Sequence, residues 1–244
     1  MPLPSFHEAT STRLDCCRRT GRISNNCLLA EPHGRRWKGF PGSSPNKIDM
    51  VHGQRILITL IRHGKPHGID PGWRSSAGFA SWLQVEGDRG IDLDDSSVGQ
   101  ALSSKWRVYC SDLRRAIDSA SHLTDPEIVC ADPMFREAGL GALTAPGFIR
   151  LPIGAWTVLV RLAWFLRIVD GPESLEQARR RALIAAARLD ADARKYRQVV
   201  VVGHGLFNGM VAAELRRLGW TGPRRPGHRY WESTTYAYEV PILD

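Results

Sequence analysis

Two short segments of the sequence combine residue types suited to binding and attacking a phosphoryl group. Arg62-His63-Gly64 ends an apolar run that begins near Arg55, and Gly203-His204-Gly205 ends a second run, Val199 to Val202. Arginine guanidinium groups match phosphate oxygens bidentately, and a neutral imidazole nitrogen can attack phosphorus. The repeated order of apolar run, histidine and glycine predicts a single site, built on paired histidines and arginines, for a phosphorylated ligand.

The apolar runs indicate the elements that position these side chains. Short apolar runs bounded by glycine and proline are typical of strands buried on both faces of a sheet. In open α/β sheets, ligands bind at the carboxyl ends of the strands, where both tripeptides lie. If the two strands are neighbours, His63 and His204 face one another. Gly64 allows the backbone to turn sharply or to approach a ligand closely.

A third segment places arginines at the start of a helix. Trp106 to Cys110 predicts a strand, and Ser111-Asp112 is expected to cap a helix that continues to about Leu123, with Leu113, Ile117 and Ala120 on its buried face. Arg114 has Asp118 four residues later, the spacing of a surface ion pair, whereas Arg115 has Ser119 there. Arg115 is therefore the arginine expected to face a ligand. The alternative is that both are solvated helix charges.

The remaining pattern alternates strands with helices and predicts an α/β fold with a largely parallel sheet covered on both faces. The apolar, aromatic segment 151–169 predicts a helix or helix pair. It is either a pocket wall with Arg161 or Arg167 turned inward, or a plain core helix. The other expected elements are a short helix within 65–97, helices at 98–104 (capped by Ser97), 173–196 and 206–218, and strands at 127–130, 198–203 and 233–240.

Composition excludes several classes of protein. The 244 residues are 43% hydrophobic and carry a net charge of +8, and no apolar stretch reaches the roughly 20 residues that a membrane span requires. We therefore expect no stable membrane insertion. About half of the excess positive charge lies in the first 50 residues, and basic residues do not alternate with aromatic ones, so nucleic-acid binding is not expected.

Residues 1–50 are poor in apolar residues and lack a helical or strand period, so we expect a disordered or loosely attached leader. A transit peptide is an alternative, and Met50 as the true initiator is the interpretation we favour. Five cysteines without regular spacing indicate a reducing compartment, and we expect a cytoplasmic protein. The adjacent Cys16-Cys17 does not match the spacing of zinc ligands, and no metal site is expected.

Taken together, Arg62-His63-Gly64, the Ser111 to Ala120 segment and Gly203-His204-Gly205 resemble the histidine phosphatase (phosphoglycerate mutase-like) superfamily, in that family's order, over roughly residues 55–240. The resemblance implies a three-layer α/β/α sandwich over 51–244, with a specificity insertion at about 145–170. It implies that His63 is the nucleophile that becomes phosphohistidine. It also implies that Arg62, Gly64, Arg115 and His204 surround the phosphoryl oxygens, His204 as part of the catalytic set.

The same resemblance indicates a proton donor. Arg136-Glu137-Ala138-Gly139 is similar to the family's acidic step, so Glu137 is the candidate. The family's aromatic–Glu–Gly continuation is replaced here by Leu140-Gly141-Ala142. Asp132 is the alternative donor, and a solvated loop carboxylate is the alternative role for Glu137.

These residues predict a metal-independent phosphomonoester hydrolase for a small phosphorylated substrate. Arginines and histidines supply the positive charge, so no cofactor is expected. A phosphoglycerate-type mutase of the same fold and a non-catalytic phosphate- or phosphoprotein-binding module are the alternatives. The sequence contains no signal for the oligomeric state or for the identity of the substrate.

Overall fold

The computed structural model describes residues 55–68, 72–86, 89–92, 102–103, 105–169 and 171–240. Contacts divide the chain into two units, Met1–Arg36 and Trp37–Asp244, and every described residue belongs to the second. The expected leader, Met50 and the cysteines of the first 50 residues lie outside the described residues.

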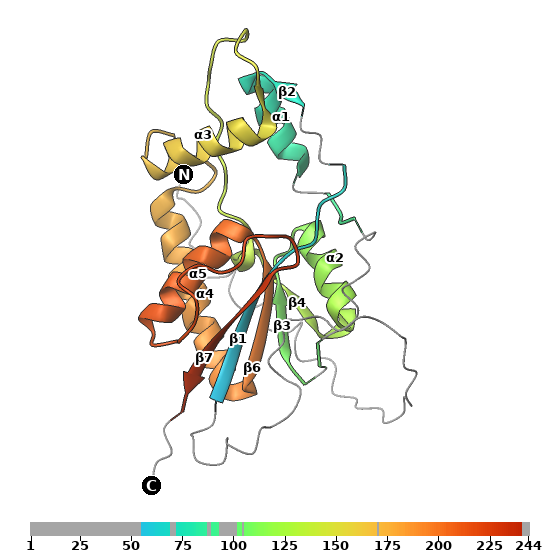
Figure 1. The fold of residues 1–244 in the computed structure, drawn as a ribbon, viewed down its shortest axis with the longest axis vertical. Coiled ribbons are helices and arrows are strands. Elements are labelled where there is room, and N and C mark those ends of the chain that lie inside the picture. Colours follow the sequence, from blue (N-terminus) through green and yellow to red (C-terminus); the bar gives the residue numbers. More distant parts are fainter. Residues whose placement is uncertain are drawn as a thin grey trace, which may run out of the picture. The chain divides into compact units, whose positions relative to one another are not determined.

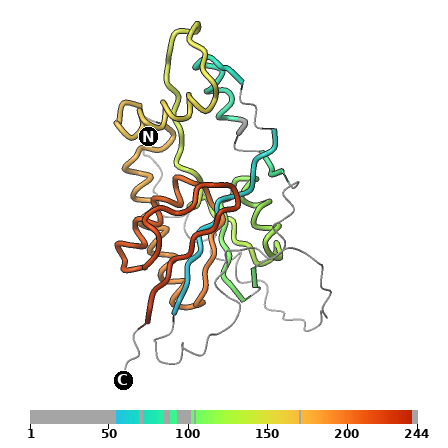
Figure 2. Tube along the Cα trace, in the orientation of Figure 1, coloured from blue at the N-terminus to red at the C-terminus, as the bar shows by residue number. Residues whose placement is uncertain are grey.

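A five-stranded sheet forms the centre of the second unit, in the order β4-β3-β6-β1-β7. The strands are β1 (Arg55–Arg62), β3 (Arg107–Cys110), β4 (Val129–Ala131), β6 (Gln198–Gly203) and β7 (Ser233–Glu239). The first four are parallel, and β7 runs antiparallel to β1. The tube in Figure 2 shows β1 and β6 side by side although more than 130 residues separate them in the chain. The sheet is mixed and mostly parallel, as the alternating pattern predicted.

Helices cover both faces of this sheet because its strands are apolar on both faces. Helices α4 (Leu175–Tyr196) and α5 (Gly205–Arg217) pack on the face that carries Ile56, Ile58 and Leu60. Helix α2 (Arg114–Leu123) packs on the opposite face, against Ile61 and Val202. Figure 1 shows the sheet between α4 and α5 on one side and α2 on the other. The expected three layers are present.

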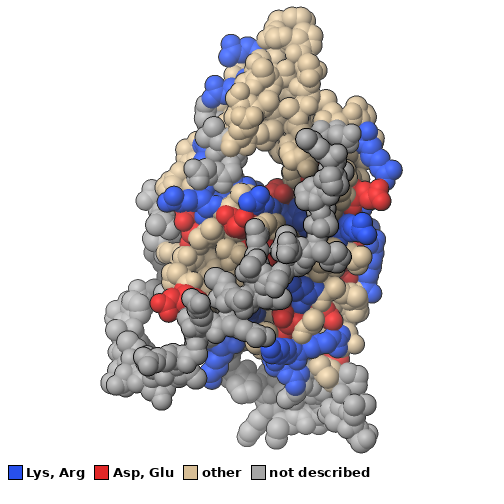
Figure 3. Space-filling model, turned by 180° about the vertical axis from the view of Figure 1, so that it is seen from behind, with Lys and Arg blue, Asp and Glu red and all other residues tan. Residues whose placement is uncertain are grey.

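A second group of elements forms what we call the small lobe. It contains α1 (Ser76–Glu86), α3 (Ile153–Phe165) and a two-stranded sheet of β2 (Trp73–Arg74) and β5 (Leu151–Pro152). Its core is aromatic: the ring of Phe79 stacks on Trp82 and Trp156, with centroids 5.7 and 6.1 Å apart. Figure 3 shows the small lobe at the top, mostly tan, with basic side chains at its edge and no acidic ones near its tip. Residues 138–169 contain no Asp or Glu at all.

The helix predicted in 151–169 is confirmed, and it begins two residues late because Leu151 and Pro152 pair with β2. The helix predicted at 98–104 lies mostly outside the described residues, and Leu102 and Ser103, which are described, are not helical. The strand predicted at 127–130 is β4, and it begins at Val129 because a 3-10 turn, Pro126–Ile128, precedes it. A second 3-10 turn, Pro133–Phe135, follows β4. No helix in the described part of the chain is long and apolar enough to cross a bilayer.

The prediction for α2 was wrong in two respects. Its N-cap residue is Leu113, and neither Ser111 nor Asp112 caps it with a side chain. Its buried face includes Arg115 and Ser119, whereas Ile117 is 37% exposed. A charged residue therefore lies on the buried face that the hydrophobic pattern gives to apolar residues.

Candidate active site

The two histidines lie at the carboxyl ends of adjacent parallel strands. Arg62 of β1 is paired in register with Gly203 of β6, so the next residues, His63 and His204, stand opposite one another. Their ring centroids are 4.9 Å apart, and the side chains are almost completely buried. The backbone N–H of His63 donates to the carbonyl of Gly203 over 3.0 Å, which fixes this juxtaposition.

The hydrogen bond of His63 defines its tautomer. Nδ1 of His63 lies 2.7 Å from the carbonyl oxygen of Gly64, which can only accept, so Nδ1 carries the proton. Nε2 is left with its lone pair. The imidazole is thus oriented with one nitrogen occupied and the other available as a nucleophile or base.

Gly64 is enclosed so tightly that a larger residue does not fit. A Cβ added there would lie 2.5 Å from the ring of Trp231. The N–H of Gly64 donates to Oγ of Ser119 over 2.8 Å, and that hydroxyl donates to the carbonyl of Arg115. Trp231 itself has a φ of 63°, in the left-handed region that bulky residues rarely adopt. Its N–H donates to the carbonyl of Arg62.

Arg115 and Arg114 point in different directions, as their spacing indicated. Arg114 is exposed and pairs with Asp118, with Nε 3.7 Å from the carboxylate. Arg115 is only 8% exposed, and its charge acts on both His63 and His204. Arg115 therefore brings a buried positive charge to the two imidazoles.

Arg62 is held by residues that the sequence analysis did not identify. Its guanidinium lies over the ring of Tyr230, 4.4 Å from the centroid, and Nη1 donates to the carbonyl of His228. The Tyr230 ring is also 5.7 Å from that of His63. Tyr230 therefore forms one wall of the site. No local pattern around it gave a signal, because it comes from the loop before β7.

The two strand ends are joined by Asn208 of α5, a second residue that was missed. Its Nδ2 donates to the carbonyl of Ile61 over 3.1 Å. A Cβ at Gly203 would lie 2.5 Å from Oδ1 of Asn208, so Gly203 is needed for this approach. The signal was present in the sequence, as a polar residue on the buried face of the helix.

Several buried polar atoms at this site have no partner within the described part of the chain. They include both ring nitrogens of His204 and Nε of Arg62. A buried polar group left unsatisfied costs about 1–3 kcal/mol. Such groups, gathered around two arginines, indicate an anionic ligand with several oxygen acceptors.

Burial and charge set the protonation of both imidazoles. Burial, followed by the Arg115 guanidinium, lowers the pKa of His63 to about 3, and Arg62 acts in the same direction. Burial, followed by His63 and Arg115, also lowers the pKa of His204 well below its usual value. His63 is therefore neutral near pH 7, as a nucleophilic nitrogen must be.

The side chain of Glu137 lies at the N-terminus of α5, the helix that begins directly after His204. Its Oε1 accepts from the N–H of Phe207 over 2.9 Å, and Oε2 accepts from that of Leu206 over 3.3 Å. Arg161 of α3 is partly buried, donates to the carbonyl of Ala138 over 3.1 Å, and its charge acts together with that of Glu137. Of the two arginines in segment 151–169, Arg161 is therefore the one turned inward, and Arg167 is exposed.

The loop that carries Glu137 is fixed by arginines on both sides. Arg136 donates two hydrogen bonds to the carboxylate of Asp112, at 2.6 and 2.7 Å. Arg181 of α4 donates to the carbonyls of Met134 and Arg136 and forms a bidentate pair with Glu173. These positioning residues were not identified from the sequence, because their partners lie up to 47 residues away.

Asp132, the alternative proton donor, lies elsewhere. It follows β4, which is three strands from β1 in the sheet order, or roughly 14 Å at the usual strand spacing. Its carboxylate accepts from Arg188 over 2.6 Å and from the N–H of Met134 over 2.8 Å. Among the described residues, no group of three His, Cys, Asp or Glu side chains is arranged to hold a metal ion.

One family profile and several solved structures resemble this chain. A profile of the histidine phosphatase superfamily (branch 1) matches residues 58–239. Similar solved structures include a mycobacterial glucosyl-3-phosphoglycerate phosphatase (21% identity, 75% of this chain and 90% of that one, TM-score 0.48). A phosphoglycerate mutase from Bacillus anthracis is 17% identical over 77% of this chain and 90% of its own, with a TM-score of 0.49.

The ecdysone phosphate phosphatase from Bombix mori is 14% identical over 78% of this chain and 95% of its own, with a TM-score of 0.46. No curated protein sequence matches this chain. The family profile spans most of the chain, including both histidine-bearing strand ends, Arg115 and Glu137. The chain therefore belongs to the histidine phosphatase superfamily.

Proposed function

We propose that the protein is a phosphomonoester hydrolase that acts through a phosphohistidine on His63. The observation that carries this proposal is the oriented His63 ring. Its Nδ1–H is bound to the Gly64 carbonyl and its low pKa keeps Nε2 unprotonated, next to two arginines and a second histidine. A neutral nucleophile inside a cationic, buried cradle suits attack on a phosphate ester.

In the first step, the Nε2 lone pair of His63 forms a bond to phosphorus as the P–O ester bond breaks. Arg62 and Arg115 stabilise the charge on the equatorial oxygens, and His204 contributes a further contact. The departing alkoxide takes a proton from the carboxyl group of Glu137.

In the second step, a water molecule gives a proton to the Glu137 carboxylate and attacks phosphorus. The N–P bond breaks, inorganic phosphate leaves and His63 is regenerated. Glu137 is the candidate for both steps because the first turn of α5, the helix whose N-cap is His204, holds its carboxylate. The positive charge at phosphorus comes from side chains of this chain, so we expect turnover without added metal.

The experiment compares hydrolysis of an aryl phosphate by the full chain and by His63→Ala, with a chelator present. We expect the variant to lose about 10⁴-fold or more in kcat, the scale seen when a covalent nucleophile is removed. Acid-quenched wild type should contain an acid-labile phosphate on His63. Equal turnover by the two proteins would contradict the proposal.

One observation favours a second candidate, a phosphate-binding module without turnover. Both carboxylate oxygens of Glu137 already accept hydrogen bonds from α5 and its own loop, as in a purely structural helix cap. Glu137→Gln separates the two. For a hydrolase, kcat should fall by about 10²–10⁴-fold while inorganic phosphate binding remains. Unchanged hydrolysis would remove Glu137 from the mechanism, and phosphate binding with no hydrolysis by the wild type would favour the module.

A further inference from the structure

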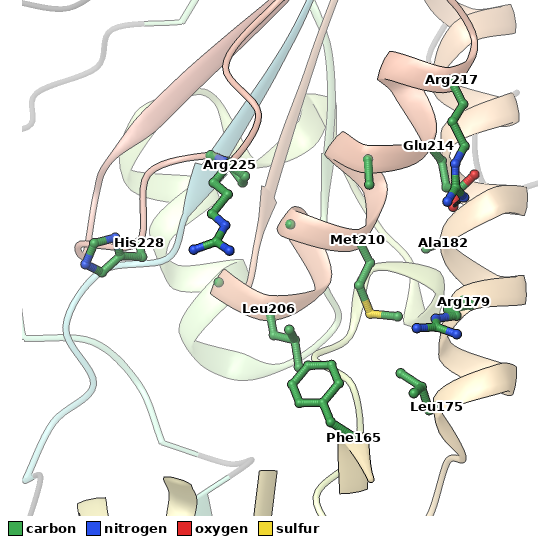
Figure 4. A pocket seen from close by; sticks show the side chains of 14 residues that line it. Phe165, Leu175, Arg179, Ala182, Leu206, Met210, Glu214, Arg217, Arg225 and His228 are labelled. Atoms are coloured by element: carbon green, nitrogen blue, oxygen red, sulfur yellow. Dashed lines mark hydrogen bonds and ion pairs between the residues drawn. The ribbon is translucent and has the colours of Figure 1, made fainter. Parts of the chain in front are cut away.

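A groove of about 970 Å³ runs along the outer face of α5, next to the histidine site. One side is mostly apolar and comes from three helices: Phe165 of α3, Leu175 of α4, and Leu206 with Met210 of α5. Arg179 of α4 lines the same side. Figure 4 shows these side chains together, with Arg225 and His228 across α5 from them. This volume is at the upper end of the range for small-molecule sites.

The floor of the groove is made of small residues. Gly205, Gly209 and Ala213 line it at successive turns of α5. A Cβ added at Gly209 would meet no atom within 4 Å, so this position opens directly into the groove. The stretch from Gly205 to Ala213 measures about 12 Å along the helix axis.

The groove begins at the phosphate-binding residues. Gly205 directly follows His204, and a Cβ added to it would lie 3.6 Å from the Arg62 guanidinium. His228, which lines the groove, accepts a hydrogen bond from Arg62 through its carbonyl. The N–H of Leu206 donates to Glu137. A molecule whose phosphate lies between the histidines can therefore extend along α5.

Cations line the groove on both sides of α5: Arg225 lies beside His228, and Arg217 lies across the helix from it (Figure 4). Arg217 and Arg225 line the groove and also a smaller adjoining hollow, which adds Arg216 and Arg224 and no acidic residue. Arg217 pairs with Glu214, whereas Arg224 and Arg225 form no ion pair with any described residue. The groove gives these loop arginines a role.

We propose that the groove binds the body of the substrate, and that the substrate is an elongated, soluble phosphomonoester with an apolar middle and a second anionic group. The Phe165, Leu175, Leu206 and Met210 side chains bind the middle, and Arg225, supported by Arg224 and Arg217, binds the second anion. This inference rests on the proposed function. A molecule charged at both ends differs from a membrane lipid, whose tail ends are apolar.

The first test measures kcat/KM of the full chain for ethyl phosphate, decyl phosphate and ω-carboxydecyl phosphate, as monomers in solution. Each buried methylene contributes a factor of roughly four, so decyl phosphate should exceed ethyl phosphate by at least about 30-fold. The terminal carboxylate should add about 10-fold through a charge-assisted contact. Equal values for ethyl and decyl phosphate would overturn the proposal. Faster hydrolysis of phosphatidate in vesicles than of ω-carboxydecyl phosphate would contradict the proposal that the substrate carries a second anionic group.

The second test fills the groove from its floor. Leucine in Gly209→Leu projects into the groove, and it is a better helix former than glycine, so the variant should fold. We expect the decyl-to-ethyl ratio to fall below about 3. The matched control is Gly154→Leu, on the exposed side of α3 where a Cβ also meets no atom, and there the ratio should stay at the wild-type value. An unchanged ratio in Gly209→Leu would contradict the groove.

The third test concerns the second anion. Arg225→Ala should abolish the advantage of ω-carboxydecyl over decyl phosphate, whereas Arg229→Ala, an exposed arginine of the same loop outside the groove, should retain it. Equal effects of both variants would mean general attraction by a basic loop and would overturn the assignment of Arg225.

A binding measurement separates this inference from the proposed function. Calorimetry with ethylphosphonate and decylphosphonate reports on the groove without turnover. Suppose that no ester is hydrolysed, that decylphosphonate binds at least about 30-fold more tightly than ethylphosphonate, and that Gly209→Leu loses this preference. The hydrolase proposal is then wrong, and the assignment of the groove is supported. If esters are hydrolysed without any chain-length preference in turnover or binding, the groove fails and the hydrolase stands.

Discussion

The sheet edge and the small lobe are built in opposite ways. At the sheet edge, His63, Arg115, Ser119 and His204 are buried, and hydrogen bonds or close contacts fix the residues around them. In the small lobe, an aromatic core around Phe79 supports a surface on which large apolar side chains are exposed. The most exposed of these are Trp73, Phe148, Val158, Leu162, Leu166 and Ile168.

This difference suggests a division of labour. The sheet edge tolerates little change because each residue constrains its neighbours, which suits a fixed reaction. The small lobe contacts the main unit through Arg161 with Ala138, the indole N–H of Trp164 with the carbonyl of Glu173, and the packing of Trp164 against Leu175 and Ala178. A region of that kind can vary and thereby alter recognition without disturbing the chemistry.

The largest expected effect comes from neighbouring arginines at the sheet edge. Arg115→Met removes a buried guanidinium that, under the proposed function, contacts the phosphoryl group, and kcat/KM for an aryl phosphate should fall by about 10²–10³-fold. Arg114→Met removes only an exposed cation paired with Asp118, so the change should stay within about 2-fold. Steady-state kinetics of both variants provide the measurement, and similar losses in the two would contradict the assignment of roles.

A glycine pair gives the next largest effect. Gly64→Ala forces a Cβ to within 2.5 Å of the Trp231 ring, and such overpacking should lower the free energy of unfolding by about 1–3 kcal/mol. Gly154→Ala in α3 meets no atom and should raise it by about 0.5–1 kcal/mol, because alanine favours helix. Chemical denaturation measures both. If Gly64→Ala left the free energy of unfolding unchanged, the Trp231 ring would be able to move away from the new Cβ at little cost.

The buried His63 at the sheet edge should make the protein less stable as the pH falls. The pKa of His63 is about 3 in the folded protein and about 6.5 when unfolded, so between these values the unfolded state binds more protons. Stability is therefore complete above about pH 6.5 and falls as pH decreases, by up to ~1.4 kcal/mol per pH unit from this one histidine. His63→Gln should show a shallower decrease between pH 6 and 4 in denaturation experiments. Parallel curves would contradict the assigned shift.

The smallest effect belongs to the tip of the small lobe. Phe148 is 86% exposed, so Phe148→Ser should change the free energy of unfolding by less than about 0.5 kcal/mol. Hydrolysis of an aryl phosphate should remain within about 2-fold of wild type. A decrease in the free energy of unfolding as large as that expected for Gly64→Ala would show that the tip of the small lobe contributes to the stability of the sheet edge.

Much of the sheet edge was predictable because its signals are local. Apolar runs that end in His-Gly indicated β1 and β6, and their parallel pairing follows from the alternation of strands and helices. The ion-pair spacing of Arg114 separated it from Arg115. Only part of the buried face of α2 was predictable. Hydrophobic periodicity placed Ala120 in the core correctly but also assigned Ile117 there, whereas Arg115 and Ser119 are the residues that are buried.

Tyr230 and Arg181 were beyond sequence reasoning for a different reason. Each acts through contacts with residues far away in the chain, such as Tyr230 with Arg62 and Arg181 with the carbonyl of Met134. The same holds for α3, whose helical character was evident but whose inward residue, Arg161, is decided by the position of the Glu137 loop.

The contact between Gly64 and Trp231 has a consequence for how this protein can diverge. The indole occupies the space that any side chain at position 64 would need, and Trp231 holds an unusual backbone conformation to do so. A larger residue at one position is acceptable only with a smaller one at the other. The two positions therefore form a single unit of variation, and a library that randomises both should yield functional pairs of one small and one large residue.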